Sequence, residues 1–184
     1  MRRLTAAFVL FLSAASTAGA QTRSREQRTA ACIEGIGERA GALAARDWEG
    51  LSRLSRRDRQ NCVGLLGKTS ETQIFELLAL AAFESRNWKT ALLSAQACTS
   101  FNYLSYSCHI HELQSLFELK RLPETERKLE MTDKLLAHLK ESIASKLKEA
   151  TSAYDLELLD IERQKLDLAI ATLDLIRIKL LPSN

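Results

Sequence analysis

The run Cys108-His109-Ile110-His111-Glu112 is the densest group of metal-ligating residue types in the chain. On a helix, Cys108 lies beside His111 and Glu112 while His109 points elsewhere, so at most three ligands could converge. A zinc site normally has a fuller ligand set, and a cysteine in a disulfide has no thiolate to offer a metal. We therefore expect a structural disulfide with partly exposed histidines here, and no metal site.

No sequence signature of a catalytic centre accompanies this run. The chain has no Gly-x-Ser-x-Gly turn, no glycine-rich phosphate loop and no His-Glu-x-x-His pair. His138, beside Lys134 and Ser142 on one helix face, is expected to be a surface or seam residue. Acidic pairs such as Asp155 with Glu162 fall on charged helix faces, where solvation explains them. We predict no catalytic residue, no cofactor and no enzymatic activity.

The first twenty residues have the three parts of a secretory signal peptide. Met1-Arg2-Arg3 is basic, an apolar stretch runs from Leu4 to Ala15, and Ala18-Gly19-Ala20 supplies small residues at a cleavage site. We predict cleavage before Gln21, a periplasmic or secreted location in a bacterium, and no transmembrane helix in the mature chain.

The four cysteines all lie in the predicted mature chain, and an exported protein with an even number is expected to pair them. Of the three connectivities, we favour Cys32 with Cys62 and Cys98 with Cys108. Each of these pairs would join helix ends that a short antiparallel connection brings together.

The charge pattern does not indicate nucleic acid. The formal net charge is only +3, and Arg2 and Arg3 of the signal contribute to it. Arg53, Arg56 and Arg57 form a local basic cluster, which is typical of a solvated helix face. A basic docking patch for a protein partner is the alternative.

The spacing of glycine, proline and polar residues predicts helices throughout. We expect a helix from Ser70, with Ser70 and Gln73 as a capping box, and a second from Trp88 to about Cys98. Residues 99–107 read as a loop, and residues 21–29 as a polar, frayed start. Three glycines weaken the helix expected over residues 32–45.

The C-terminal third is an amphipathic helical segment. Pro123 suits a first helical turn, and residues 124–181 contain neither glycine nor proline. A coiled-coil-like seam is expected at apolar residues spaced by threes and fours: Leu129, Leu136, Leu139, Ile143, Leu147, Ala150, Tyr154, Leu158 and Ile161. One long helix and a hairpin broken near Thr151-Ser152 both fit, and the segment either packs on the body or pairs with another chain.

Two short motifs suggest an internal repeat. Arg46-Asp47-Trp48 resembles Arg86-Asn87-Trp88, and both tryptophans are expected to anchor the core between hairpins. The pattern from residue 75 to residue 98 resembles the tetratricopeptide repeat, a helical hairpin with small residues where its helices cross. The repeat core that this resemblance assigns is Phe75, Leu78, Ala79, Ala82, Trp88, Ala91 and Ala95. An unrelated helical bundle is the alternative, since a helical period alone fits both.

The prediction is an all-α protein of antiparallel hairpins, tetratricopeptide-like or an irregular bundle, followed by a long amphipathic helix or helical hairpin. Its predicted parts are residues 1–20 as signal, 21–122 as a disulfide-stapled hairpin domain, and 123–184 as the long helical segment. The resemblance implies a surface that binds proteins, with Tyr103 and Tyr106 as further partner contacts. We expect an adaptor or a subunit of a cell-envelope assembly; the alternatives are a self-associating structural protein joined through residues 123–184 and, third, a metal-binding or membrane-surface protein.

Overall fold

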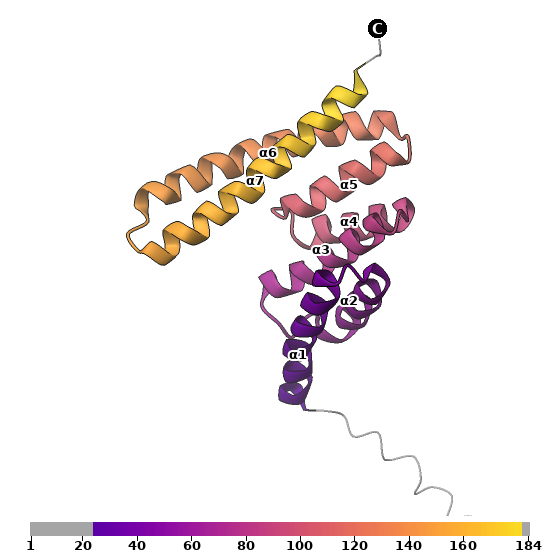
Figure 1. The fold of residues 1–184 in the computed structure, drawn as a ribbon, viewed down its shortest axis with the longest axis vertical. Coiled ribbons are helices and arrows are strands. Elements are labelled where there is room, and N and C mark those ends of the chain that lie inside the picture. The colour runs from indigo at the N-terminus through magenta and orange to yellow at the C-terminus, as the bar shows by residue number, and fades with distance from the viewer. Residues whose placement is uncertain (1–23, 182–184) are drawn as a thin grey trace, which may run out of the picture.

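The computed structural model describes residues 24–181, which form seven helices and no strand. The all-α prediction is confirmed, whereas the predicted signal peptide lies outside the described residues. The helices are α1 (Arg25–Ala44), α2 (Trp48–Cys62), α3 (Lys68–Glu84), α4 (Trp88–Phe101), α5 (Tyr106–Glu118), α6 (Leu122–Glu149) and α7 (Ala153–Leu180). Each helix packs against the next, and α3–α5 and α5–α7 are also in contact, so the chain builds a stack of antiparallel hairpins (Figure 1).

Three of the connections have the same local geometry. Arg46, Arg86 and Lys120 have φ of 53°, 56° and 57°, the left-handed conformation that ends a helix. The residue after each of them donates its N–H to a carbonyl five residues earlier, and then begins the next helix. The hairpins α1–α2, α3–α4 and α5–α6 are therefore joined by one type of turn. The sequence motif that relates the two tryptophans is this turn. In the third turn Leu122 stands at the tryptophan position, and Pro123 follows it.

Several predicted boundaries are wrong for identifiable reasons. Ser70 does not cap α3, because the helix already begins at Lys68 and has no side-chain cap. The preceding loop is held instead by Glu71, whose carboxylate accepts the N–H groups of Gly64 and Leu66 at 2.6 and 3.1 Å. The loop predicted over residues 99–107 is shorter, since α4 continues to Phe101.

The N-terminal helix is stronger than its glycines predict. It begins with a capping box between Ser24 and Gln27, so residues 25–29 are helical, whereas residues 21–23 of the predicted frayed start lie outside the described residues. Helix α1 then runs through Gly35, Gly37 and Gly41. Packing against α2 offsets the low helix propensity of glycine at Gly35, where the neighbouring helix approaches closely.

The C-terminal segment is a hairpin. Ser152 caps α7 by accepting the N–H of Asp155 at 3.0 Å, which settles the alternatives left by the sequence. Leu136, Leu166 and Leu173 form a buried cluster with Leu113 of α5. The predicted seam is wrong beyond the break, because Tyr154, Leu158 and Ile161 are exposed on α7.

The core matches most of the predicted repeat residues. Phe75, Leu78, Ala79, Ala82, Ala91 and Ala95 are buried, and Ala79, Ala91 and Ala95 have no exposed surface. Trp48 and Trp88 are partly buried, and Trp48 packs against the core cluster of Leu51, Leu77 and Ala81. Trp88 packs at the hairpin edge, 5.0 Å from the ring of Phe83.

The cysteines are paired as the sequence analysis favours. Cys32 and Cys62 join α1 to α2, and Cys98 and Cys108 join α4 to α5, with Cα–Cα distances of 5.6 and 5.9 Å. All four are buried. Each disulfide therefore fixes a pair of helices that are consecutive in the stack.

Candidate functional site

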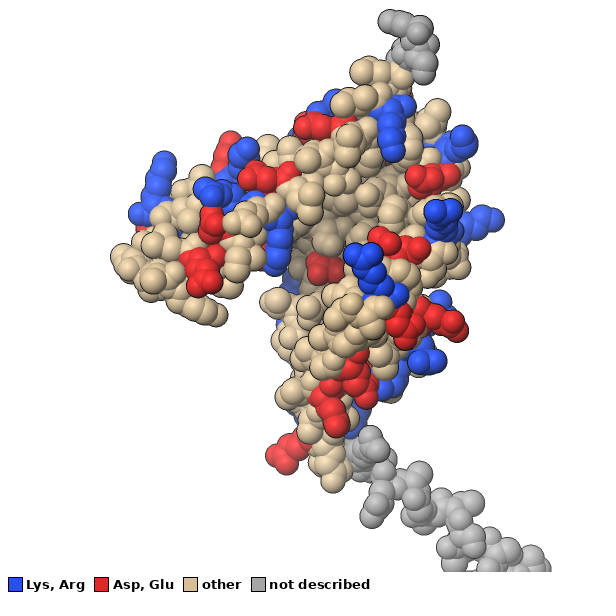
Figure 2. Space-filling model, viewed as in Figure 1, with Lys and Arg blue, Asp and Glu red and all other residues tan. Residues whose placement is uncertain are grey.

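A groove of about 770 Å³ lies on one side of the stack. Its walls come from the odd-numbered helices α3, α5 and α7, and the short α4–α5 connection closes one end. The molecular surface is hollowed between the projecting α6–α7 hairpin and the helices below it (Figure 2). Because consecutive hairpins stack in the same sense, α3, α5 and α7 each turn one face toward the groove.

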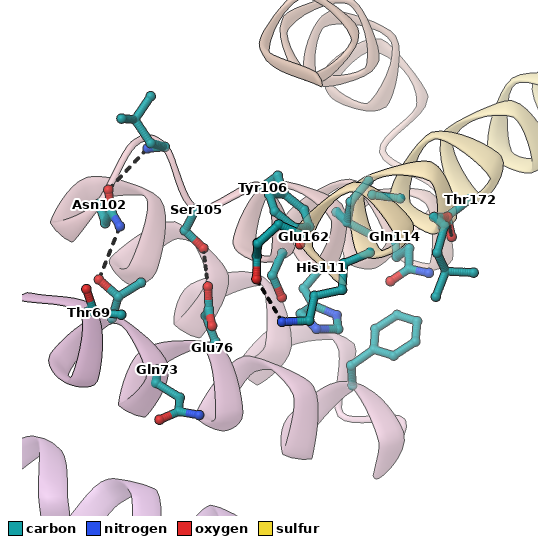
Figure 3. Close-up of a pocket in the computed structure, with 18 of the residues that line it drawn as sticks. Thr69, Gln73, Glu76, Asn102, Ser105, Tyr106, His111, Gln114, Glu162 and Thr172 are labelled. Atoms are coloured by element: carbon teal, nitrogen blue, oxygen red, sulfur yellow. Dashed lines mark hydrogen bonds and ion pairs between the residues drawn. The ribbon is translucent and has the colours of Figure 1, made fainter. Parts of the chain in front are cut away.

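One face of each helix supplies the groove side chains (Figure 3). Thr69, Gln73 and Glu76 are three and four residues apart on α3, which places them on one stripe. They are polar side chains on a helix whose other faces are largely buried. Helix α5 contributes Tyr106, Ile110, His111 and Gln114, and α7 contributes Glu162, Lys165, Leu168 and Thr172.

The closed end of the groove is held by hydrogen bonds. Ser105 donates its hydroxyl to Glu76 at 2.5 Å and accepts the N–H of Cys108, so one side chain both caps α5 and ties it to α3. Asn102 donates its side-chain amide to the hydroxyl of Thr72 at 3.2 Å. The α4–α5 connection is therefore fixed against α3 from two points, which makes the groove a preformed feature.

The charge of the groove is acidic. Glu76, Glu84 and Glu162 line it together with a single basic side chain, Lys165, whose ammonium lies 2.8 Å from Glu162. With that pair neutralised, the remaining charge is carboxylate. A neutral or basic ligand suits this field better than an acidic one.

Two aromatic groups of α5 are held neutral in the groove wall. Burial lowers the pKa of His111 to about 4, and a side-chain hydrogen bond with Gln114 opposes this only in part. Its Nδ1 is buried without a hydrogen-bond partner among the described residues, and its ring lies 5.7 Å from that of Phe83. Burial, followed by the charges of Glu162 and Glu76, raises the pKa of Tyr106 to about 12. Both residues are therefore uncharged at neutral pH, and the hydroxyl of Tyr106 can donate or accept a hydrogen bond.

The predicted contact residues are not gathered at one place. Tyr106 lines the groove, but Tyr103 is exposed outside its lining and packs against the ring of His109. Arg53 and Arg56 line a separate hollow between α2 and the α3–α4 hairpin. Arg57 is engaged in ion pairs with Glu38 and Asp58, at 2.6 and 2.8 Å, so the arginine cluster is partly structural.

The Cys108 to Glu112 run has no metal site in the described part of the chain. Cys108 is in a disulfide, and no group of three or more His, Cys, Asp or Glu side chains within residues 24–181 is arranged to hold a metal. The expectation of partly exposed histidines is wrong for His109, which is fully buried with its Nε2 2.8 Å from the carbonyl oxygen of Tyr103. Glu112 forms a buried ion pair with Lys128 of α6, and His138 is exposed on α6.

Sequence reasoning missed most of the groove. Glu76 and Gln114 drew no attention, Gln73 was considered only as part of a capping box, and His111 only as a possible metal ligand. A usable signal was present on α3, where a polar stripe of Thr69, Gln73 and Glu76 interrupts an apolar helix. Which helices would face that stripe depends on the stacking of hairpins, which the sequence does not reveal.

Comparison with known proteins adds no assignment. No protein-family model, curated protein or solved structure matches the chain. Within residues 24–181, no helix has both the length and the apolar character required to cross a bilayer. The function is therefore inferred from the geometry and charge of the groove.

Proposed function

We propose that this chain is an exported, non-enzymatic protein-interaction module, acting as an adaptor or as a subunit of a cell-envelope assembly. The observation that carries the proposal is the groove on α3, α5 and α7, which is open, preformed and lined by hydrogen-bonding side chains. A bound protein segment would lie along it, with its backbone amides facing Gln73, Gln114 and His111.

The lining supports a peptide ligand more than a small metabolite. Its polar groups are spread along three helices and include neutral donors and acceptors, which suit a repeating backbone. Two large apolar contacts, Phe83 and Leu168, supply places for side chains. The acidic excess favours a segment carrying lysine or arginine.

The cysteines and the resemblance noted in the sequence support the same role. Two buried disulfides suit an oxidising compartment, in agreement with a periplasmic or secreted location. Stacked helical hairpins of the tetratricopeptide type present concave surfaces to protein ligands. This support is an analogy of fold and is weaker than the groove itself.

Photo-crosslinking in the cell of origin tests the proposal. A benzophenone amino acid placed at Gln73 or at Gln114 should crosslink one partner of defined size, and the same probe at Lys89, on the exposed surface of α4, should not. A Gln73→Arg substitution should then abolish the crosslink from position 114, because an added cation repels a basic segment and fills the groove. Equal crosslinking from Lys89, or none from the groove, would show that the groove is not the interaction site.

A further inference from the structure

Helix α7 has two apolar faces, and only one of them is used. Leu166, Leu173 and Ile176 are buried against α5 and α6. A second set lies on a different side of the helix and is exposed: Tyr154 at 72%, Leu158 at 49%, Ile161 at 42%, Leu168 at 71% and Leu175 at 60%. Isolated apolar residues on a surface are ordinary, but a line of five along one helix marks an interaction site.

The second set follows a coiled-coil period. Counting by fours and threes from Tyr154 gives eight positions, of which five are apolar and three are polar: Lys165, Thr172 and Lys179. We call these eight positions the outer stripe. Its period is that of a seam made to pack against another helix, because a simple amphipathic face has no reason to keep a strict heptad.

The hairpin that carries the outer stripe is poorly covered by the rest of the chain. Helices α6 and α7 have 28 residues each, whereas α5, on which they pack, has 13. No residue from 137 to 165 is buried, and Figure 1 shows the α6–α7 turn projecting away from the other helices. The projecting part of the hairpin, residues 137–165, has no buried residue and therefore gains little from its own packing.

We propose that a second copy of this chain docks on the outer stripe, with the two α7 helices antiparallel about a two-fold axis between Leu166 and Asp167. In this register Leu158 packs on Leu175 of the partner copy, and Lys165 extends over Leu168 of the partner copy. The stripe is then complementary to itself in the manner that a two-fold interface requires.

Charge selects the antiparallel arrangement. Parallel helices in register would place Lys165 against its own copy, and Lys179 likewise, in the centre of the interface, where like charges are destabilising. The ammonium of Lys179 lies 5.9 Å from the ring centroid of Phe117 in its own chain. The antiparallel register also sets Lys179 beside Glu157 of the other copy, which gives an opposite charge. Thr172 meets Ile161. The two Lys165 side chains lie on either side of the two-fold axis, and each is paired with Glu162 of its own helix.

The proposal does not depend on the groove having a ligand. Lys165, Leu168 and Thr172 border the groove, whereas the remaining five positions of the outer stripe lie beyond its lining. Loss of self-association would therefore leave groove crosslinking from Gln73 to be judged separately.

Sedimentation equilibrium of the oxidised chain without residues 1–20 tests the self-association. We expect a reversible monomer–dimer equilibrium. Leu175, which is 60% exposed and lies outside the groove lining, is the position to change. Leu175→Asp should weaken the dimer at least about 100-fold, as expected for a charge introduced at a seam position (about 3 kcal/mol). Leu93→Asp is the matched control: Leu93 is 68% exposed on α4, outside the stripe, and should leave the dimer unchanged. A monomer at all concentrations, or equal effects of the two substitutions, would overturn the proposal.

A charge exchange tests the register. Lys179→Glu alone and Glu157→Lys alone should each weaken the dimer a few-fold, and the double variant should recover the original affinity, because the two residues meet only across the antiparallel interface. If each single change weakens the dimer and the double variant is weaker still, the helices are not in this register. Circular dichroism should show equal helicity in all variants, since the substituted residues are exposed.

Discussion

At the residue scale, the least replaceable contact joins α1 to α2. Arg39 and Asp58 are both buried and form an ion pair, and Arg57 bridges Asp58 to Glu38 at the surface. Burial, followed by the charge of Arg57, lowers the pKa of Arg39. Both charges are buried away from water. Removing either one would leave the other unpaired in the interior, which would destabilise the fold.

We expect single and double substitutions of this pair to differ. Asp58→Leu or Arg39→Met alone should destabilise the chain by about 3–5 kcal/mol, because each leaves an unpaired buried charge. The double variant should lose much less, since two apolar side chains of similar volume need no partner. Urea unfolding followed by circular dichroism measures all three, and additive losses would mean that the pair is not coupled.

His111 should make stability depend on pH. Its pKa of about 4 in the folded chain is below the ordinary value of 6.5, so the unfolded chain binds more protons between these values. Stability should therefore be complete above pH 6.5 and fall as the pH is lowered toward 4, by about 2 kcal/mol between pH 6.5 and pH 5. His109, whose pKa is lowered by burial and then by Lys128, acts in the same direction.

Urea unfolding at pH 7 and pH 5 checks this dependence. His111→Gln should remove most of the difference between the two pH values, whereas His138→Gln, at an exposed position on α6, should leave it intact. An unchanged slope in the His111 variant would assign the effect to other groups.

At the scale of the element, α1 contains glycines in two different environments. A Cβ added at Gly35 would lie 2.6 Å from the carboxylate of Asp58, whereas nothing lies within 4 Å of one added at Gly37. Gly35 therefore permits the close approach of α2, while Gly37 only weakens the helix.

Two alanine substitutions should consequently have opposite signs. Gly35→Ala should destabilise by about 1–3 kcal/mol, as it displaces a carboxylate held by two arginines. Gly37→Ala should stabilise by about 0.5–1 kcal/mol through helix propensity alone. Thermal unfolding of both variants decides the matter, and a stabilising Gly35→Ala would show that α2 can move away.

The repeated turns offer another element-scale prediction. Arg86 has φ of 56°, a conformation that costs a residue with a Cβ about 1 kcal/mol. Arg86→Gly should raise stability by about 0.5–1 kcal/mol after the greater freedom of glycine in the unfolded chain is counted. Arg86→Ala, which keeps the Cβ, is the control and should show no such gain in a thermal melt.

At the scale of the whole molecule, cohesion is uneven. The α3–α4 and α4–α5 contacts contain many fully buried side chains, whereas the projecting half of α6–α7 contains none from 137 to 165. The disulfides also lie in the first five helices. The body and the projecting hairpin should therefore open with different free energies.

Hydrogen exchange followed by mass spectrometry should show this gradient. In dilute solution, amides of residues 139–163 should exchange much faster than those of α3, because local opening there exposes little apolar surface. Raising the protein concentration should slow exchange in α7 if a second copy covers the outer stripe. Uniform protection along the chain would contradict the uneven cohesion.

Sequence by itself determined the helices, because their determinants are local. Periodic apolar residues, Asn87 as a cap, Pro123 in a first turn and Ser152 after the break all act within a few positions of where they stand. The cysteine pairing favoured from the sequence also followed from the short separation of helix ends. Boundaries such as that of α3 escaped prediction because Glu71, several residues away, fixes the preceding loop.

Tertiary structure alone decided the site. The facing of α3, α5 and α7, the burial of His109 and the placement of Asp58 against Gly35 depend on how hairpins stack, and residues far apart in sequence carry no local sign of meeting. Tyr154, Leu158 and Ile161 illustrate the difference: their spacing predicted a packed seam, but after the turn at residues 150–152 they lie on the exposed surface of the molecule. Local period fixes which residues share a helix face, and only packing fixes what that face meets.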